Sequence, residues 1–372
     1  MRKSVMTLAI ASVFALPTVV LGQAAAPAPA APTLDKVLEA SGLSLSGYVD
    51  TAYQRADRNI EPTNFSTRVF DSQNNSFVLH QVGLQMAKQP KEGFGGLVNI
   101  TAGRDAGVIK SFDSTDSTFD VTQAYAQYAT GAFTLIAGKF TTLHGTEVIW
   151  SPSNANFSRS ILFGAVPFTH TGFRGTFAMS DMVSFTAGIN NGWDQMKDMN
   201  KGKTLELGTT ITPIKPLTIN GSYYGGQESS ATGVTGRRDS FNLVGSYTVI
   251  EPLTLGLEYL RVQQEKAVFD STGTAVKGKY SGFAGYLSYT FVPKLKGSVR
   301  VETFDDKDSL HFAMPATKYK EYTLTLAYLA ADNFELRGEV RTDRANQAVF
   351  TENSTNSSKT LTTFAVQALY KF

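Results

Sequence analysis

Two short stretches of the chain carry charges at alternating positions. They are KGSVRVE (296–302) and ELRGEVR (335–341). Successive side chains of a strand point to opposite faces, so the acids and bases of each stretch share one face. They could pair into a salt-bridged wall or form a charged ladder that aligns and selects passing ions. The candidate residues are Arg300, Glu302, Arg337, Glu339 and Arg341.

A second group of candidates surrounds an irregular stretch, WSPSNANFSR (150–159), which has neither the period of a strand nor that of an amphipathic helix. It lies in a connection from Thr141 to Thr169, roughly double the length at which an unstructured loop becomes unusual. Its apolar pieces are VIW (148–150) and ILFGAVPF (161–168). Exposure of these side chains to water would be unfavourable, so we expect the loop to bury them. The candidates in and beside it are Lys139, Glu147, Arg159, His170 and Arg174.

Catalytic chemistry has little support in the sequence. A hydrolase would need a serine beside a histidine base that an acid or amide orients. His170 lies near several serines and threonines, but no G-x-S-x-G turn surrounds it. No histidine pair or mixed histidine and carboxylate cluster has metal-site spacing. We expect no catalytic residue, metal or cofactor, and an enzyme that uses His170 is the alternative.

The elements that position these residues are segments of about ten to thirteen residues in which apolar and polar positions alternate. Tilted transmembrane strands need about nine to eleven residues, whereas strands of soluble domains usually have five or six. The sequence predicts sixteen such strands, at 43–54, 76–88, 93–103, 119–130, 132–141, 170–179, 182–192, 203–212, 216–225, 238–249, 252–264, 279–291, 294–304, 319–330, 333–343 and 360–372.

The connections between these strands alternate in length. Seven tight turns, such as TG (130–131) and EP (251–252), alternate with eight loops of about ten to thirty residues. This order predicts an all-β, transmembrane antiparallel up-and-down barrel with both chain ends at the short-turn end, which is periplasmic in Gram-negative outer-membrane barrels. The connection from Thr141 to Thr169 is the third long loop and the longest.

Aromatic residues gather on the apolar faces beside the short turns, as at the headgroup boundary of a membrane. They are Tyr128, Phe133, Tyr247, Tyr289, Phe291, Tyr328, Phe334, Tyr370 and Phe372. The last strand, FAVQALYKF, ends in Phe372 and resembles the C-terminal signature of bacterial outer-membrane barrels. That resemblance implies contact with the barrel-assembly machinery, and the apolar faces imply contact with outer-membrane lipid.

The N-terminal region predicts export. Residues 1–22 combine Arg2 and Lys3 with an apolar run and small residues, as in a signal peptide with cleavage between 22 and 26. A membrane anchor is the alternative, but the run contains Pro17 and is shorter than the roughly twenty residues that span a bilayer. Residues 23–42 are an Ala/Pro-rich linker and a short N-terminal segment in which TLDKVLEASG could form one helix, and 43–372 are the barrel.

Composition excludes several further classes. The chain has no cysteine, which removes disulfides and thiolate metal sites. A net charge of +2 over 372 residues gives no reason to expect nucleic acid as a partner. Secreted soluble β-proteins are disfavoured by strand length and by the alternating connections.

Several motifs resemble the OmpL-like β-barrel porins of Gram-negative bacteria. They are AGKFTTLHGTEVI (137–149), NFSRSILFG (156–164) and PFTHTGFR (167–174), with SGYVDTAY (46–53) similar to the family's first strand. The resemblance implies an outer-membrane channel, with Lys139, Glu147, Arg159, His170 and Arg174 at the pore. The third loop also resembles that of general porins, which folds into the lumen, and a homotrimer is plausible on the same ground.

A barrel of sixteen strands has a lumen too wide for side chains to fill, so its default content is water. We therefore expect a porin for small hydrophilic solutes or ions, with the loop 141–169 as a constriction that tunes size and charge selectivity. An extracellular lid and a subunit-contact loop are alternatives for that loop. A barrel enzyme acting on outer-membrane lipid and an adhesin or scaffold are alternatives for the function.

Overall fold

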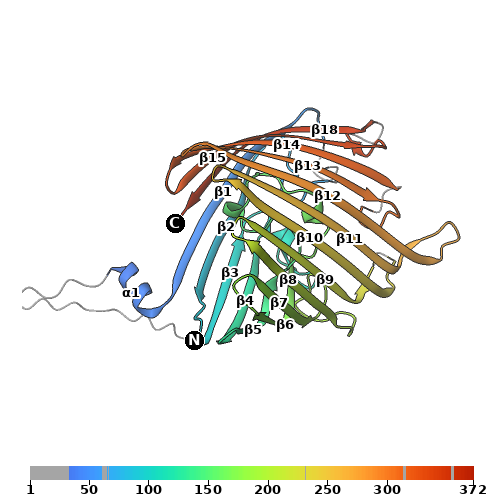
Figure 1. Cartoon of the computed structure of the whole chain (residues 1–372). Coiled ribbons are helices and arrows are strands. Elements are labelled where there is room, and N and C mark those ends of the chain that lie inside the picture. The colour runs from blue at the N-terminus through green and yellow to red at the C-terminus, as the bar shows by residue number, and fades with distance from the viewer. Residues whose placement is uncertain (1–32, 61–64, 66, 231, 313–315, 353–355) are drawn as a thin grey trace, which may run out of the picture.

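Sixteen strands close into one antiparallel barrel in the computed structural model (Figure 1). The structure describes residues 33–60, 65, 67–230, 232–312, 316–352 and 356–372. Barrel strands that follow one another along the chain are paired, and β1 pairs with β18 to close the ring. Strand pairing thus leaves no open sheet edge, as a membrane-spanning sheet requires. Within the described residues, no helix is long and apolar enough to cross a membrane.

The barrel strands are β1 (Ser44–Ala56), β2 (Ser76–Lys88), β3 (Gly93–Ala102), β4 (Phe119–Thr130), β5 (Phe133–Thr141), β6 (Thr169–Ala178), β7 (Val183–Asn190), β8 (Thr204–Ile214), β9 (Leu217–Ser229), β10 (Thr235–Ile250), β11 (Leu253–Phe269), β12 (Ala275–Val292), β13 (Leu295–Asp306), β14 (Thr317–Ala331), β15 (Phe334–Ala345) and β18 (Thr360–Lys371). The short elements are α1 (Leu34–Ser41), α2 (Ala106–Ile109), η2 (Ser151–Ser153), α3 (Ile161–Gly164) and a hairpin of β16 (Phe350–Thr351) and β17 (Ser357–Ser358).

The sixteen predicted strands are confirmed, because each predicted segment overlaps one barrel strand. Exposure alternates along them as the period of two requires: in β13, Val299 and Val301 are exposed while Arg300 and Glu302 are buried. The predicted helix after the linker is α1, which ends at Gly42 in the left-handed conformation. The predicted signal peptide and the linker up to residue 32 lie outside the described residues.

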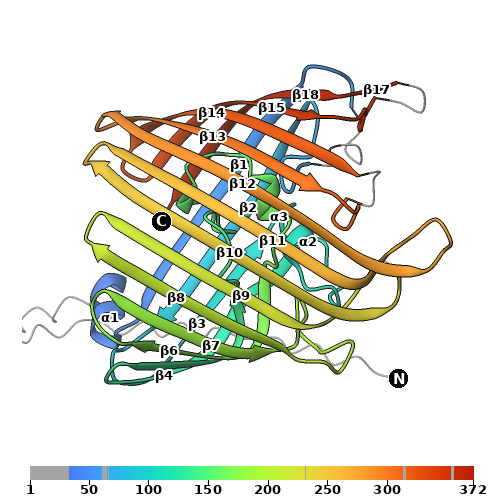
Figure 2. The same ribbon diagram turned by 45° about the vertical axis from the view of Figure 1, so that its right-hand side comes forward.

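Two connections differ from the prediction of ten or more residues. Residues 230–234 join β9 to β10, and residues 270–274 join β11 to β12, because the strands continue beyond the predicted ends. The β11–β12 ladder resumes after an irregularity between Gln264 and Val268, with Val268 opposite Val276. The resulting hairpin extends beyond its neighbours (Figure 2). Backbone pairing with the neighbouring strand therefore continues through residues whose sequence lacks a clear alternation, and these residues are strand in the structure.

The short turns, α1 and the C-terminus lie at one end of the barrel, and the longer connections lie at the other (Figure 1). The predicted aromatic residues lie beside the short turns, and seven of the nine have exposed side chains: Tyr128, Phe133, Tyr247, Phe291, Tyr328, Tyr370 and Phe372. Large apolar side chains are also exposed elsewhere on the outward faces, among them Leu257, Leu324 and Val366. A soluble protein would bury so continuous an apolar surface.

Gly138 provides a test of the barrel wall beside the long loop. Its φ of 138° and the overlap that an added Cβ would make with the Ala124 carbonyl oxygen both oppose any side chain. Gly138→Ala should destabilise the barrel by at least about 1–3 kcal/mol and lower the folded fraction after refolding in detergent. Heat-modifiable migration on a gel measures that fraction. Gly245→Ala is the control, because its Cβ would meet no atom within 4 Å; equal loss in both variants would contradict the prediction.

Candidate functional site

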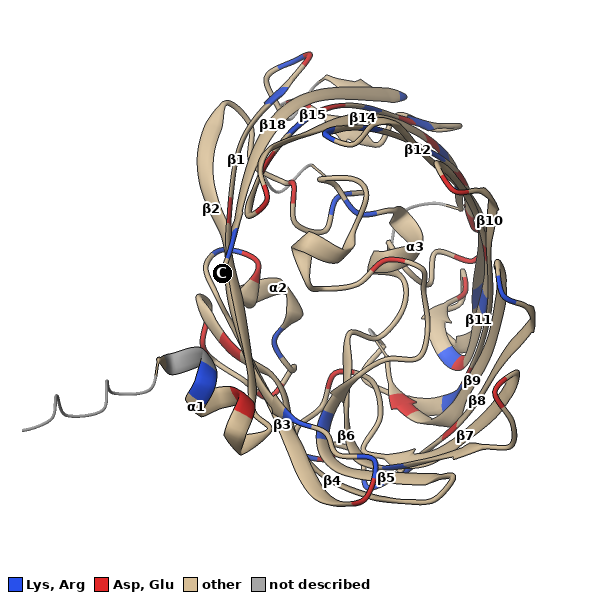
Figure 3. Ribbon diagram, turned by 60° about the vertical axis from the view of Figure 1, so that its left-hand side comes forward, with Lys and Arg blue, Asp and Glu red and all other residues tan. Residues whose placement is uncertain are grey.

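The loop between β5 and β6, residues 142–168, crosses the interior of the barrel. Viewed along the barrel, α3 of this loop lies inside the ring of strands, as does α2 of the preceding loop (Figure 3). Its apolar side chains are buried there: Ile149 and Phe163 cluster with Phe70 and Ile109 from the first two long loops. The expectation of a loop folded into the lumen is confirmed.

The first part of the loop follows the wall from β9 to β11. Residues 143–146 are hydrogen-bonded in turn to side chains that point inward from these strands. The pairs are Leu143 N with Tyr224 Oη at 2.8 Å, His144 with Ser222 at 2.7 Å and Ser240 at 2.9 Å, Gly145 N with Asn242 Oδ1 at 3.0 Å, and Thr146 N with Glu258 Oε2 at 3.0 Å. Side chains of the wall thus supply the hydrogen-bond partners that a neighbouring strand would supply in a sheet.

Two wall carboxylates hold the second part of the loop. Glu302 accepts hydrogen bonds from the backbone N–H groups of residues 161 and 162, at 2.8 and 2.7 Å. Glu339 accepts from those of residues 157 and 158, at 2.7 and 3.0 Å. Both carboxylates are buried, and charge-assisted bonds of this kind are about twice as strong as neutral ones. These two glutamates therefore fix the loop against β13 and β15.

Arg300 connects the loop to the same wall, because all three nitrogens of its guanidinium group donate hydrogen bonds. It donates to Glu147 Oε1 at 2.6 Å and to the Ser158 carbonyl at 2.8 Å, and pairs with Glu321 on β14 at 3.1 Å. The other oxygen of Glu147 accepts from Ser160 N at 2.7 Å. Arg300 is fully buried, so its charge is compensated by carboxylates and carbonyls rather than by water.

The other predicted arginines on this side also bind loop backbone. Arg159 is 1% exposed and donates to the carbonyls of Val148 and Phe157, at 3.1 and 2.9 Å. Arg341 donates to the Arg159 carbonyl, and Arg337 donates to that of Asn156 at 3.3 Å. The structure therefore brings together seven of the ten predicted residues: Glu147, Arg159, Arg300, Glu302, Arg337, Glu339 and Arg341.

The other three predicted residues lie on β5 and β6, at the ends of the loop. Lys139 pairs with Asp120 on β4 at 3.0 Å. Arg174 forms an ion pair with the buried Glu206 on β8 and donates to the Thr141 carbonyl at 2.9 Å. His170 is the third, and these three residues lie apart from the other seven.

His144 and His170 lack the partners of a hydrolase. His170 contacts the Gly192 carbonyl at 2.9 Å and stacks on Tyr224 with ring centroids 4.4 Å apart. His144 contacts two serines, but both ring nitrogens are then used and no acid orients it. Among the described residues, no group of three or more His, Cys, Asp or Glu could hold a metal ion.

Asp194, in the connection between β7 and β8, holds the end of the loop. Its Oδ1 accepts from Phe168 N at 2.8 Å and from Thr169 N at 2.9 Å. Burial raises the pKa of Asp194 to about 7, and the two backbone N–H groups only partly oppose this. No local pattern in the sequence marks Asp194, because its backbone partners are set by tertiary contact.

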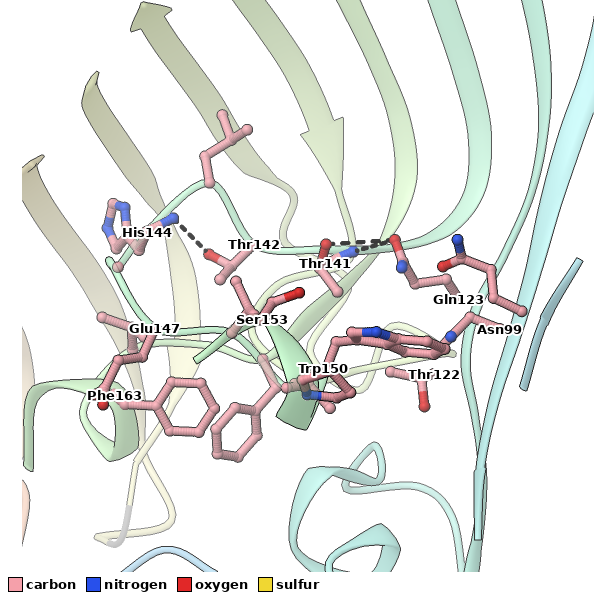
Figure 4. Close-up of a pocket in the computed structure, with 18 of the residues that line it drawn as sticks. Asn99, Thr122, Gln123, Thr141, Thr142, His144, Glu147, Trp150, Ser153 and Phe163 are labelled. Carbon is pink, nitrogen blue, oxygen red and sulfur yellow. Dashed lines mark hydrogen bonds between the residues drawn. The ribbon is translucent and has the colours of Figure 1, made fainter. Parts of the chain in front are cut away.

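Between the loop and the wall of β1–β4 lies a cavity of about 540 Å³. Three amides from neighbouring strands, Gln85, Asn99 and Gln123, line it. Figure 4 shows Asn99 and Gln123 facing Trp150 of the loop. The sequence prediction selected site residues mainly by charge, and these amides are uncharged, so it did not include them. Their positions on the inward faces of β2, β3 and β4 are the signal that could have identified them.

A closed barrel of sixteen strands, narrowed by an internal loop, defines a porin-type channel for small solutes. Residues 42–372 match the family described as "putative beta-barrel porin-2, OmpL-like", and the chain belongs to this family. The resemblance seen in residues 137–174 is thereby confirmed and extends over the whole barrel. A search of the curated proteins gives no match.

Solved outer-membrane proteins share the fold at low sequence identity. The channel DcaP of Acinetobacter baumannii has a TM-score of 0.62 and 12% identity, covering 89% of this chain and 97% of that one. An anion-selective porin from Comamonas acidovorans has a TM-score of 0.59 and 10% identity, covering 89% and 99%. OmpT of Vibrio cholerae, in a trimer form, has a TM-score of 0.59 and 12% identity, covering 89% and 99%.

Removal of both supporting carboxylates should release the loop. Each lost hydrogen bond to a charged acceptor is worth about 1.5–3 kcal/mol, so we expect trypsin to cut after Arg159 at least about tenfold faster in Glu302→Ala/Glu339→Ala than in the parent. Mass spectrometry of the fragments measures the cut. Glu335→Ala is the control, because Glu335 pairs with Arg337 and touches no loop backbone. Equal protection in all three proteins would show that the carboxylates do not hold the loop.

Asp194 predicts a pH dependence. Its folded pKa of about 7 lies above the unfolded value of about 4, so its contribution to stability is full below pH 4 and is lost as pH rises through 7. The Tm in detergent should therefore fall between pH 5 and pH 8 more steeply in the parent than in Asp194→Asn, whose amide does not titrate. Identical slopes would contradict the assigned pKa.

Proposed function

We propose that this porin passes small hydrophilic solutes or ions through a water-filled lumen whose narrowest point is set by residues 142–168. The observation that supports it most directly is the fixed course of this loop inside a barrel of sixteen strands. Irregular backbone is tolerated at membrane depth where it lines water or is buried in protein, and in our proposal this loop does both.

The ten predicted residues act on permeation chiefly as supports of this loop in our proposal. Seven hold its middle against β13–β15, and Lys139, His170 and Arg174 hold the wall near its ends. Their charges are paired within the wall or bonded to loop carbonyls, so the salt-bridged arrangement is better supported than a free charged ladder. Charge selectivity would then be weak, and the size of the opening would dominate.

The orientation we propose places the short turns, α1 and the C-terminus in the periplasm, and the longer connections outside the cell. This supports a role for Phe372 as the residue that the barrel-assembly machinery reads, and for the apolar outward faces as the lipid contact. Export through a signal peptide at residues 1–22 belongs to the same proposal. A homotrimer is supported by the trimer form of the Vibrio cholerae protein with the same fold.

A channel without enzymatic activity is the proposal for this barrel. It is supported by the porin family and by the absence, in the part of the chain that the structure describes, of a histidine with both a serine and an acid among its hydrogen-bond partners. Lipid hydrolysis by the purified protein that is lost in His170→Ala would favour the enzyme instead.

Planar bilayers test the channel directly. The purified folded protein should produce stepwise conductance, and the Glu302→Ala/Glu339→Ala variant should produce larger or noisier steps, because a released loop no longer narrows the lumen. Glu335→Ala should keep the parent value. Folded protein that never opens a channel would overturn the proposed function.

Reversal potentials in a salt gradient test the role of the charges. We expect Glu147→Ala to shift ion preference little by its own charge and to change conductance through the loop, because Glu147 is bonded to both Arg300 and Ser160. Arg159→Ala should behave alike. A large change of ion preference with unchanged conductance would support the charged ladder.

A further inference from the structure

The cavity beside the loop has a wall of uncharged hydrogen-bonding side chains in register. Ser46 lies opposite Gln85, Gln85 opposite Asn99, and Asn99 opposite Gln123, so one row crosses β1 to β4. An irregularity after Asn99 brings Thr122 to the cavity as well. Directly opposed positions lie within about 5.5 Å of one another, which gives a compact array of donors and acceptors.

Two of these amides keep hydrogen-bonding capacity for a ligand. Asn99 is 3% exposed, and within the described chain its Nδ2 has no hydrogen-bond partner. Gln123 accepts from the Thr141 N–H and hydroxyl, both at 3.3 Å, through Oε1 alone. A buried amide nitrogen without a partner is costly, so a solute that pairs with Nδ2 after a turn of the Asn99 side chain toward the cavity gains free energy.

The opposite wall is aromatic. Trp150 of the loop is held edge-on by Tyr48, with ring centroids 4.4 Å apart, and lines the cavity with Phe163 and Phe168. Figure 4 shows Trp150 and Phe163 on the loop side. The face of an indole carries the negative part of the ring quadrupole and favours the slightly positive C–H groups of a saturated ring. One side of the cavity therefore suits hydroxyl groups, and the other suits a C–H face.

Charge contributes little to this cavity. Of the described residues that line it, only Glu147 and Lys371 are charged, and Glu147 is already bonded to Arg300 and Ser160. His144 also lines it, and burial lowers the pKa of His144 well below its usual value, so the ring is neutral. A charged solute would lose hydration here with little compensation.

We propose that this cavity is a binding subsite of the channel for neutral polyhydroxylated solutes of about monosaccharide or disaccharide size. The inference rests on the proposed function, since a subsite acts on permeation only if solutes pass beside the loop. A volume of about 540 Å³ is typical of small-molecule sites. A purely apolar solute would leave the amides unpaired, and an ion would find no unpaired partner charge apart from Lys371.

Sugar-dependent block of the potassium chloride current tests the proposal. D-glucose and sucrose should reduce single-channel current in a saturable manner. Gln85→Leu and Asn99→Leu should raise the half-saturating concentration about tenfold, because each removes an amide from a site built to bond hydroxyls. Gln347→Leu, which makes the same change away from the cavity lining, is the control and should match the parent.

Fluorescence tests binding without conductance. The chain has two tryptophans, so Trp193→Phe leaves Trp150 as the sole tryptophan emitter. D-glucose and sucrose should change its emission saturably, and succinate should not. Binding without any conductance would support the subsite and sink the proposed function. Conductance with neither saturable block nor an emission change, or a response to succinate alone, would overturn the subsite and leave the porin intact.

Discussion

Backbone N–H groups that leave a β-sheet inside a membrane barrel must find new partners, and the structure depends on how this requirement is met. Inside the lumen, residues 142–168 replace strand partners with side chains from the wall. Glu302 and Glu339 each take two successive N–H groups, and Arg300 and Arg341 take carbonyls. A loop without such partners would lose several kcal/mol per buried polar group.

This requirement explains why many charged side chains point into the lumen even though little of their charge is left unpaired. The guanidiniums and carboxylates on β13–β15 neutralise one another and satisfy the loop, so they are largely withdrawn from water. The cavity between the loop and β1–β4 is lined by amides, hydroxyls and aromatic rings instead. The charged support of the loop and the largely uncharged cavity thus lie at different walls of one barrel.

The barrel could be predicted almost completely because its wall repeats one simple rule. Membrane and water lie on opposite sides of every strand, so a period of two in the sequence reports directly on orientation. Leu257 and Glu258 in β11 show the contrast, with the first exposed outward and the second buried inward. The alternation weakens where strands rise beyond the others, as in β10–β12, since both faces are then wet, and it is interrupted where the register shifts, as between β1 and β2.

The sequence by itself determined the strands, their inward and outward faces, the internal loop and the ten charged or polar candidates, since each follows from local period, length or residue type. Tertiary structure alone decided what those candidates touch: Glu302 meets residues 161–162, and Asp194 meets residues 168–169, across separations that no local pattern encodes. The row from Gln85 through Asn99 to Gln123 likewise depends on strand register. Register and loop placement are set by the closed ring as a whole, which is why they became visible only in the folded chain.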